Sequence, residues 1–194
     1  MQTPQIAQLI VAPTRVFAEH VARADAAAPR WGEVLAALSV PTAVVGAAIA
    51  FGYADALLAP HFVGSVLLLA ASFGIQSFSA AFVGGVLYRR RARATLGPFA
   101  LTLVAHEAFF VGITATAFLV PGRSAAGVGV VLAAACVAWN LFLTYALFRA
   151  FGGVSRWHRA RALLGVALHF STIAVLVGIY MRVQNLLPYP PGLP

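Results

Sequence analysis

Five polar side chains stand inside long apolar stretches of this 194-residue chain, and their types could carry chemistry. They are Gln76, His106, Glu107, Asn140 and His169. Ionisable groups inside a hydrocarbon layer are costly, which makes them functional candidates by default. At a rise of ~1.5 Å per residue, Glu107, Asn140 and His169 each lie on the order of 12 Å from the arginine-rich end of their own stretch. We therefore expect four of them, His106, Glu107, Asn140 and His169, to form one layer within a helical bundle.

The functional interpretations of this layer are a metal site, a proton relay and a quinone-facing site. Consecutive helical residues point about 100° apart, so His106 and Glu107 cannot both face the same partner. Metal binding needs more ligands, because the stretch after His106 lacks the second histidine of the zinc protease signature and His169 is the only other candidate at that depth. We therefore favour a hydrogen-bonded cluster that locks helix packing, with no metal and no cofactor.

No soluble enzyme motif accompanies the layer. The chain contains no Ser-His-Asp arrangement, Walker loop or dinucleotide fingerprint. Cys136 is the single cysteine, which excludes a disulfide framework, a thiolate metal site and a haem attachment motif. We expect neither an enzyme nor any catalytic residue.

The elements that must position these side chains are five apolar stretches. Each is long enough for the roughly 20 residues that a helix needs to cross a ~30 Å hydrocarbon core. Hydrophobic residues make up 61% of the chain and charged residues 9%, which leaves too little polar surface for a water-soluble globule. The expected fold is an all-α membrane protein with five transmembrane helices, preceded by an N-terminal amphipathic interfacial helix. The stretches are Val34–Leu58, Phe62–Tyr88, Phe99–Val120, Ala125–Phe148 and Ala162–Met181.

The N-terminal helix is predicted from the spacing of apolar residues. Val16, Phe17 and Val21 recur at roughly helical intervals between charged residues. Pro13 is best tolerated in the first turn of a helix, so we expect the helix to cover residues 14–26. Its apolar face is too short to span, which predicts a helix lying in the plane of the membrane interface.

One domain accounts for the chain. Residues 34–184 form the five-span transmembrane domain, and residues 1–33 form a cytoplasmic or interfacial segment. Residues 185–194 form a Pro-rich extracytoplasmic tail. Neither flanking segment is long enough to bury a core of its own.

The basic residues are distributed unevenly along this plan. Eleven of the 13, all of them arginine, fall in the N-terminal segment and in the connections that follow the second and fourth stretches. Positively charged loops resist translocation, so we expect these segments and the N-terminus in the cytoplasm and the C-terminus on the opposite side. The arginines lack the interleaved aromatics of a nucleic-acid platform, so anionic lipids are the expected counter-charge and nucleic acid is not. Two groups should mark the headgroup level and the topology: Arg89, Arg90, Arg91 and Arg93, and Arg156, Arg159 and Arg161.

Two segments of the chain carry a combination of Pro, aromatic, Gly and Arg residues around predicted spans. The first runs from Ile10 to Glu19, with Pro13, a Phe four residues later, and Trp31 before the first span. The second begins with Trp139 in the fourth span and passes through a glycine break at residues 152–153 to a restart at Arg161, which is followed by Ala and Leu. These segments resemble the YIP family, the Ypt/Rab-GTPase-interacting membrane proteins, in its bacterial form. The five-span count agrees with that family, so the resemblance covers nearly the whole chain.

The resemblance implies a small, non-enzymatic membrane protein that acts as a scaffold or accessory protein. Eukaryotic members carry a long cytosolic arm that is linked to Rab binding, whereas about 33 residues precede the first span here, so Rab recognition is not carried over. The third span also has Gly112 where the family usually has a proline. For bacterial relatives no activity follows from the resemblance.

The expected setting is a bacterial inner membrane, because arginine fully replaces lysine and Ala, Gly and Val abound, as in proteins from GC-rich genomes. The expected partners are anionic lipids and other membrane proteins or further copies of the chain. Two alternatives stay open. The protein could be an accessory subunit of a larger bioenergetic complex, or a small transporter or proton-coupled permease that uses Glu107 and His169.

Overall fold

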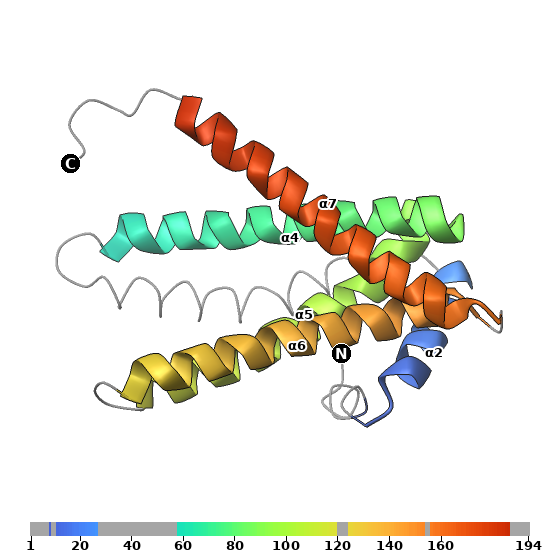
Figure 1. Cartoon of the computed structure of the whole chain (residues 1–194), viewed down its shortest axis with the longest axis horizontal. Helices are drawn as coiled ribbons and strands as arrows, with labels where there is room; N and C mark the ends of the chain where they lie inside the picture. The colour runs from blue at the N-terminus through green and yellow to red at the C-terminus, as the bar shows by residue number, and fades with distance from the viewer. Residues whose placement is uncertain (1–7, 9–10, 27–57, 120–123, 154–155, 187–194) are drawn as a thin grey trace.

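The structure, a computed structural model, describes residues 8, 11–26, 58–119, 124–153 and 156–186 (Figure 1). Within these ranges the chain forms helices joined by short turns and contains no strand. The first predicted span, up to residue 57, and the tail from residue 187 lie outside the described residues. The helices are α2 (Pro13–Ala26), α4 (Leu58–Tyr88), α5 (Ala92–Leu119), α6 (Ser124–Phe151) and α7 (His158–Leu186).

Three of these helices, α4, α6 and α7, are long and apolar enough to cross a membrane. Their qualifying segments are Ala70–Tyr88, Val130–Phe151 and His158–Tyr180. These segments fall on the second, fourth and fifth apolar stretches of the sequence. Helix α5 has 28 residues, and its side chains are described as far as His106. The described part of the protein is therefore all-helical and built for a membrane.

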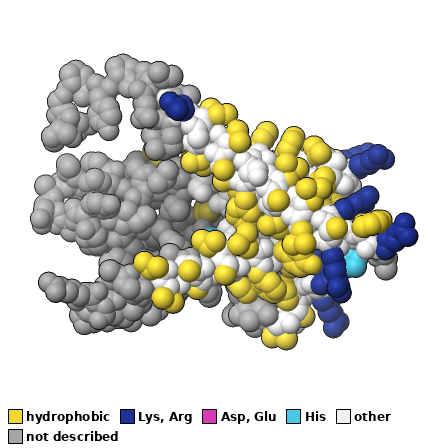
Figure 2. Space-filling view, in the orientation of Figure 1, with side chains coloured by type: hydrophobic (Ala, Val, Ile, Leu, Met, Phe, Trp, Pro, Cys, Tyr) yellow, Lys and Arg dark blue, Asp and Glu magenta, His cyan; other side chains and the backbone are white. Residues whose placement is uncertain are grey.

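The core is mostly apolar, as in a water-soluble bundle, but the outer surfaces of these helices are apolar as well. Several polar residues are buried between the helices, whereas large apolar side chains cover their outer surfaces (Figure 2). An apolar exterior is stable in a bilayer, because lipid tails are as apolar as leucine and burying these side chains between helices would give no hydrophobic gain. The buried polar residues are Ser79, Thr95, Thr102, Thr144 and His169. The exposed apolar residues on the spanning helices include Phe78, Phe82, Val130, Val137, Leu163, Leu164, Val175 and Ile179.

Helix α2 packs against α5 and α6, near the end of the bundle at which α4 and α6 finish and α5 and α7 start (Figure 1). Pro13 occupies its first position, where a missing amide hydrogen costs nothing. Val16, Phe17 and Val21 are buried in the same apolar core as residues of α5 and α6. The face that we expected to enter lipid is therefore packed against protein, because α5 and α6 offer it an apolar surface.

A tight turn joins α4 to α5, and α5 starts earlier than hydropathy predicts. Arg89 ends α4 in the left-handed region, with a φ of 53°, and its amide donates to the carbonyl of Gly85 over 3.1 Å. The carbonyl of Arg91 then accepts hydrogen bonds from the amides of Ala94 and Thr95 at 3.0 and 3.1 Å, which starts α5 at Ala92. Pro98, which we expected near the helix start, lies buried in its second turn. Helix α5 consequently begins about two turns before the predicted third span, Phe99–Val120.

Candidate functional site

Four aromatic side chains and one histidine meet where α4, α5, α6 and α7 come together. We call this set the aromatic junction, and its members are Tyr88, Phe99, Phe148, Phe151 and His169. The ring of Phe148 lies in the middle, with centroids 5.9 Å from Tyr88 and 5.9 Å from His169. The Tyr88 ring stacks on Phe148 with an interplanar angle of 12°, and Phe151 meets Tyr88 edge-on at 5.6 Å. Such pairs contribute about 0.5–1.5 kcal/mol each beyond the area they bury, so the junction ties four helices together.

His169 is the buried titratable member of this junction, with 1% of its surface exposed. Its ring lies edge-on to Phe99 at 5.6 Å and to Phe148 at 5.9 Å. Its backbone carbonyl accepts a hydrogen bond from the Ser79 hydroxyl over 2.9 Å, which fixes α7 against α4. Among the described residues, no group is within hydrogen-bonding distance of its Nδ1 atom. The side chain is thus held by aromatic rings, while the backbone makes the polar contact between helices.

Three of the candidate residues, His169, His106 and Asn140, fall at two levels along the bundle. Because Phe99 stands beside His169, His106 lies seven residues further along α5, about 10 Å away along the axis. The Trp139 indole donates to the carbonyl of Ala105 over 3.4 Å, which places the neighbouring Asn140 at the level of His106. The structure thus separates His169 from the level of His106 and Asn140.

Gln76 and Asn140 take part in hydrogen bonds within their own helices. The Gln76 amide donates to the Ser72 hydroxyl over 3.2 Å, and the Thr144 hydroxyl donates to the side-chain Oδ1 of Asn140 over 3.3 Å. Each pair is four residues apart on one helix, the spacing at which helical side chains meet. The side chain of Glu107 lies outside the described residues, so its predicted contact with His169, Asn140 or Gln76 stays a prediction. In the described part of the chain, no group of three or more His, Cys, Asp or Glu side chains could hold a metal ion.

Exposed arginines gather at the end of the bundle next to the aromatic junction (Figure 2). Arg90, which belongs to the same sequence run, is partly buried, and its guanidinium lies 4.9 Å from the centre of the Phe151 ring. That cation–π contact fixes the α4–α5 turn over the end of α6. We call the exposed set the arginine face, and its members are Arg89, Arg91, Arg93, Arg156, Arg159 and Arg161.

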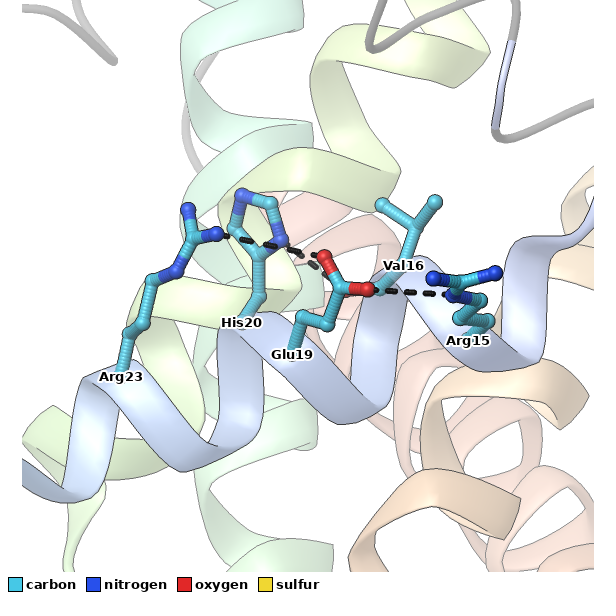
Figure 3. A network of polar contacts seen from close by, with 5 residues as sticks. All are labelled: Arg15, Val16, Glu19, His20 and Arg23. Atoms are coloured by element: carbon cyan, nitrogen blue, oxygen red, sulfur yellow. Dashed lines mark hydrogen bonds and ion pairs between the residues drawn. The ribbon is translucent and has the colours of Figure 1, made fainter.

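The outer surface of α2 carries a separate charged group (Figure 3). Glu19 lies between two arginines one turn away on either side, 3.3 Å from Arg15 and 3.9 Å from Arg23. The ring Nδ1 of His20 lies 2.9 Å from the carbonyl of Val16. The two ion pairs are exposed i,i+4 pairs worth ~0.3–0.5 kcal/mol each, so they stabilise the helix rather than form a site.

Sequence reasoning found the arginines and the buried histidine but not the aromatic junction. Its members come from four helices, and contacts between distant residues leave no periodic signal in a single sequence. One partial signal was available at Gly165, since a Cβ there would lie 3.0 Å from the Phe148 ring and 3.2 Å from the Tyr88 hydroxyl. A glycine inside an apolar span marks a position where another side chain approaches closely.

Comparisons of the chain with protein-family models, characterised proteins and solved structures gave no match. The class of the protein therefore rests on its own features. The described chain is an all-helical, membrane-embedded protein with an aromatic junction and an arginine face at one end.

Proposed function

We propose that the protein is a non-enzymatic scaffold or accessory protein of a bacterial inner membrane, related in kind to the YIP family. In this proposal the chain spans the membrane five times, with Val34–Leu58 as the first span. The arginine face and α2 lie on the cytoplasmic side, and the protein acts through anionic lipids and other membrane proteins. The support from sequence is the one-sided distribution of arginines and the resemblance of two segments to that family.

The observation that carries the proposal is that the buried side chains contact other parts of the bundle. The rings of the aromatic junction contact one another across helices, and the Ser79 hydroxyl of α4 donates to the His169 carbonyl of α7. The Thr102 and Thr172 hydroxyls donate to carbonyls of their own helices. These contacts hold helices in place, whereas the outer surfaces of the helices and the arginine face are open to lipid and to partners. A protein built in this way presents surfaces rather than a reaction centre.

A pull-down in mild detergent followed by mass spectrometry tests this proposal. We expect membrane proteins to co-purify in stable, stoichiometric amounts, including subunits of a bioenergetic complex if the chain serves one. A purified homo-oligomer that moves a solute in liposomes would contradict the scaffold role.

The second candidate, a proton-coupled permease, is favoured by the buried Nδ1 atom of His169. Glu107→Gln separates the two proposals. If the polar residues only stabilise packing, this substitution retains the fold and partner binding at a cost of about 1 kcal/mol. If Glu107 carries protons, the same change abolishes transport while the thermal denaturation midpoint stays nearly constant.

A further inference from the structure

We propose that the arginine face binds one anionic phospholipid headgroup that carries two phosphate groups, with one phosphate at each of two arginine runs. The runs are residues 89–93, between α4 and α5, and residues 156–161, at the start of α7. The inference rests on the proposed membrane scaffold and adds the chemical class of the lipid that its charged end selects.

The fold brings the two runs together although more than 60 residues separate them in sequence. The Tyr88 hydroxyl, next to the first run, donates to the carbonyl oxygen of Arg161 over 3.0 Å. The Arg90 guanidinium lies over Phe151 at the end of α6, and a Cβ at the next residue, Gly152, would be 3.2 Å from the Cβ of His158. The first run, the end of α6 and the second run are thus neighbours around the aromatic junction.

The positive charge of this surface is not neutralised within the described part of the chain. The ion pairs found there both use Glu19 on α2, and they engage Arg15 and Arg23 rather than the arginine face. Helix dipoles largely cancel at this end, because α5 and α7 begin there while α4 and α6 end there. The field at the surface therefore comes from the exposed guanidinium groups.

The surface also stands where phosphate groups of a bilayer lie. It adjoins the ends of α4, α6 and α7, the three helices that can span a membrane. Trp157, within the second run, is 59% exposed, and the Arg156 guanidinium lies 5.6 Å from its ring centre. An exposed tryptophan at a span end is typical of the headgroup region. A lipid of the same leaflet can thus reach the arginines without leaving the bilayer.

Guanidinium chemistry and the two-run geometry together select the headgroup. The planar fork of Arg donates two parallel hydrogen bonds to one phosphate, so each run can hold a phosphate of its own. A headgroup with two linked phosphates engages both runs and orders one molecule. Two singly charged lipids must order two molecules, which costs more entropy for the same contacts.

The test uses the full-length protein in vesicles that contain cardiolipin and phosphatidylglycerol at equal phosphate content in a zwitterionic background. After extraction in mild detergent, co-purifying lipids are quantified by mass spectrometry. We expect cardiolipin to be enriched over phosphatidylglycerol, relative to the vesicle composition. Replacing either run with glutamine, R89Q/R91Q/R93Q or R156Q/R159Q/R161Q, should lower that enrichment at least about fivefold, since one arginine near a membrane surface is worth ~1 kcal/mol.

Arg182→Gln is the matched control, because Arg182 is exposed on α7 some 20 residues from the second run, and it should keep the wild-type enrichment. Lysine versions of both triple variants keep the charge that directs insertion but lose the fork, and we expect a reduced enrichment from them as well. The proposal is overturned if the wild type shows no preference at equal phosphate content, or if correctly inserted glutamine variants retain it. If the glutamine variants fail to insert, wild-type enrichment in the lysine variants overturns it. Each result is independent of whether a protein partner co-purifies.

Discussion

The Tyr88 hydroxyl at the end of α4 donates a hydrogen bond to the carbonyl oxygen of Arg161 in the first turn of α7, over 3.0 Å. Through this contact the last residue of one spanning helix fixes the start of another. The same tyrosine ring stacks on Phe148 of α6, so one side chain connects three helices.

Tyr88→Phe removes the hydroxyl and keeps the ring. We expect a loss of about 1 kcal/mol in stability, the typical value for one hydrogen bond between helices in a membrane. The thermal denaturation midpoint in mild detergent measures this loss. Tyr145→Phe is the control, since no hydrogen bond of the Tyr145 hydroxyl is found among the described residues, and it should leave the midpoint unchanged. Equal midpoints for the two variants would show that the Tyr88 bond contributes nothing.

Substitution by alanine is expected to have opposite effects on stability at Gly84 and at Gly85. A Cβ at Gly84 would overlap the side chain of Thr95 on α5, whereas one at Gly85 would meet its nearest neighbour, a backbone oxygen, at 4.0 Å. Gly84→Ala should therefore destabilise by roughly 1–3 kcal/mol through overpacking. Gly85→Ala should be neutral or stabilise by up to ~1 kcal/mol, because alanine favours the helix.

Thr95→Ala provides the second half of this test. It removes the atoms closest to the Gly84 Cβ position, so the double variant Gly84→Ala/Thr95→Ala should recover part of the lost stability. A double-variant cycle in denaturation midpoints measures the coupling. Strictly additive effects would contradict the close approach of α4 and α5 at this point.

Phe17→Ala tests whether the apolar face of α2 packs against protein or against lipid. The side chain is fully buried, at 0% exposure, so Phe17→Ala should cost about 3–5 kcal/mol and release α2 from α5 and α6. Limited proteolysis near residue 26 and the denaturation midpoint would both report the release. The exposed Ala18 gives a control, with Ala18→Ser expected within ~0.5 kcal/mol of wild type. A helix held only by lipid would leave the midpoint of Phe17→Ala close to that of the control.

His169→Phe distinguishes a packing role from a proton role. A phenylalanine keeps an aromatic ring between Phe99 and Phe148, and the hydrogen bond from Ser79 uses the backbone of residue 169. We expect a stability change below about 1.5 kcal/mol and unchanged partner binding, whereas His169→Ala should cost ~2–5 kcal/mol by leaving a cavity. Loss of function in the phenylalanine variant, without loss of stability, would favour the permease.

How much the sequence could predict depends on the range of the interaction involved. Long apolar runs marked α4, α6 and α7, because hydropathy over some 20 residues is a strong local signal. The start of α5 was missed because Pro98 suggested a helix start, while the amides of Ala94 and Thr95 find the Arg91 carbonyl and begin the helix at Ala92.

The site was predictable only in its local parts. The apolar periodicity around Phe17 fits a membrane surface and a protein surface equally well, since both accept the same helical face. The aromatic junction depends on Phe99, Phe148 and His169, which meet only after four helices have packed. The one-sided distribution of arginines, by contrast, could be read directly from the sequence, because it depends only on where the charges fall relative to the apolar stretches.

In the proposed topology the arginine face and the C-terminus lie on opposite sides of the bilayer. Single cysteines at positions 91 and 194, in a background that carries Cys136→Ala, allow labelling of intact cells with a membrane-impermeant reagent. Five spans and a cytoplasmic arginine face predict labelling of Pro194→Cys from outside and of Arg91→Cys only after the membrane is opened. Labelling of both positions from the same side would contradict the five-span topology and the proposal built on it.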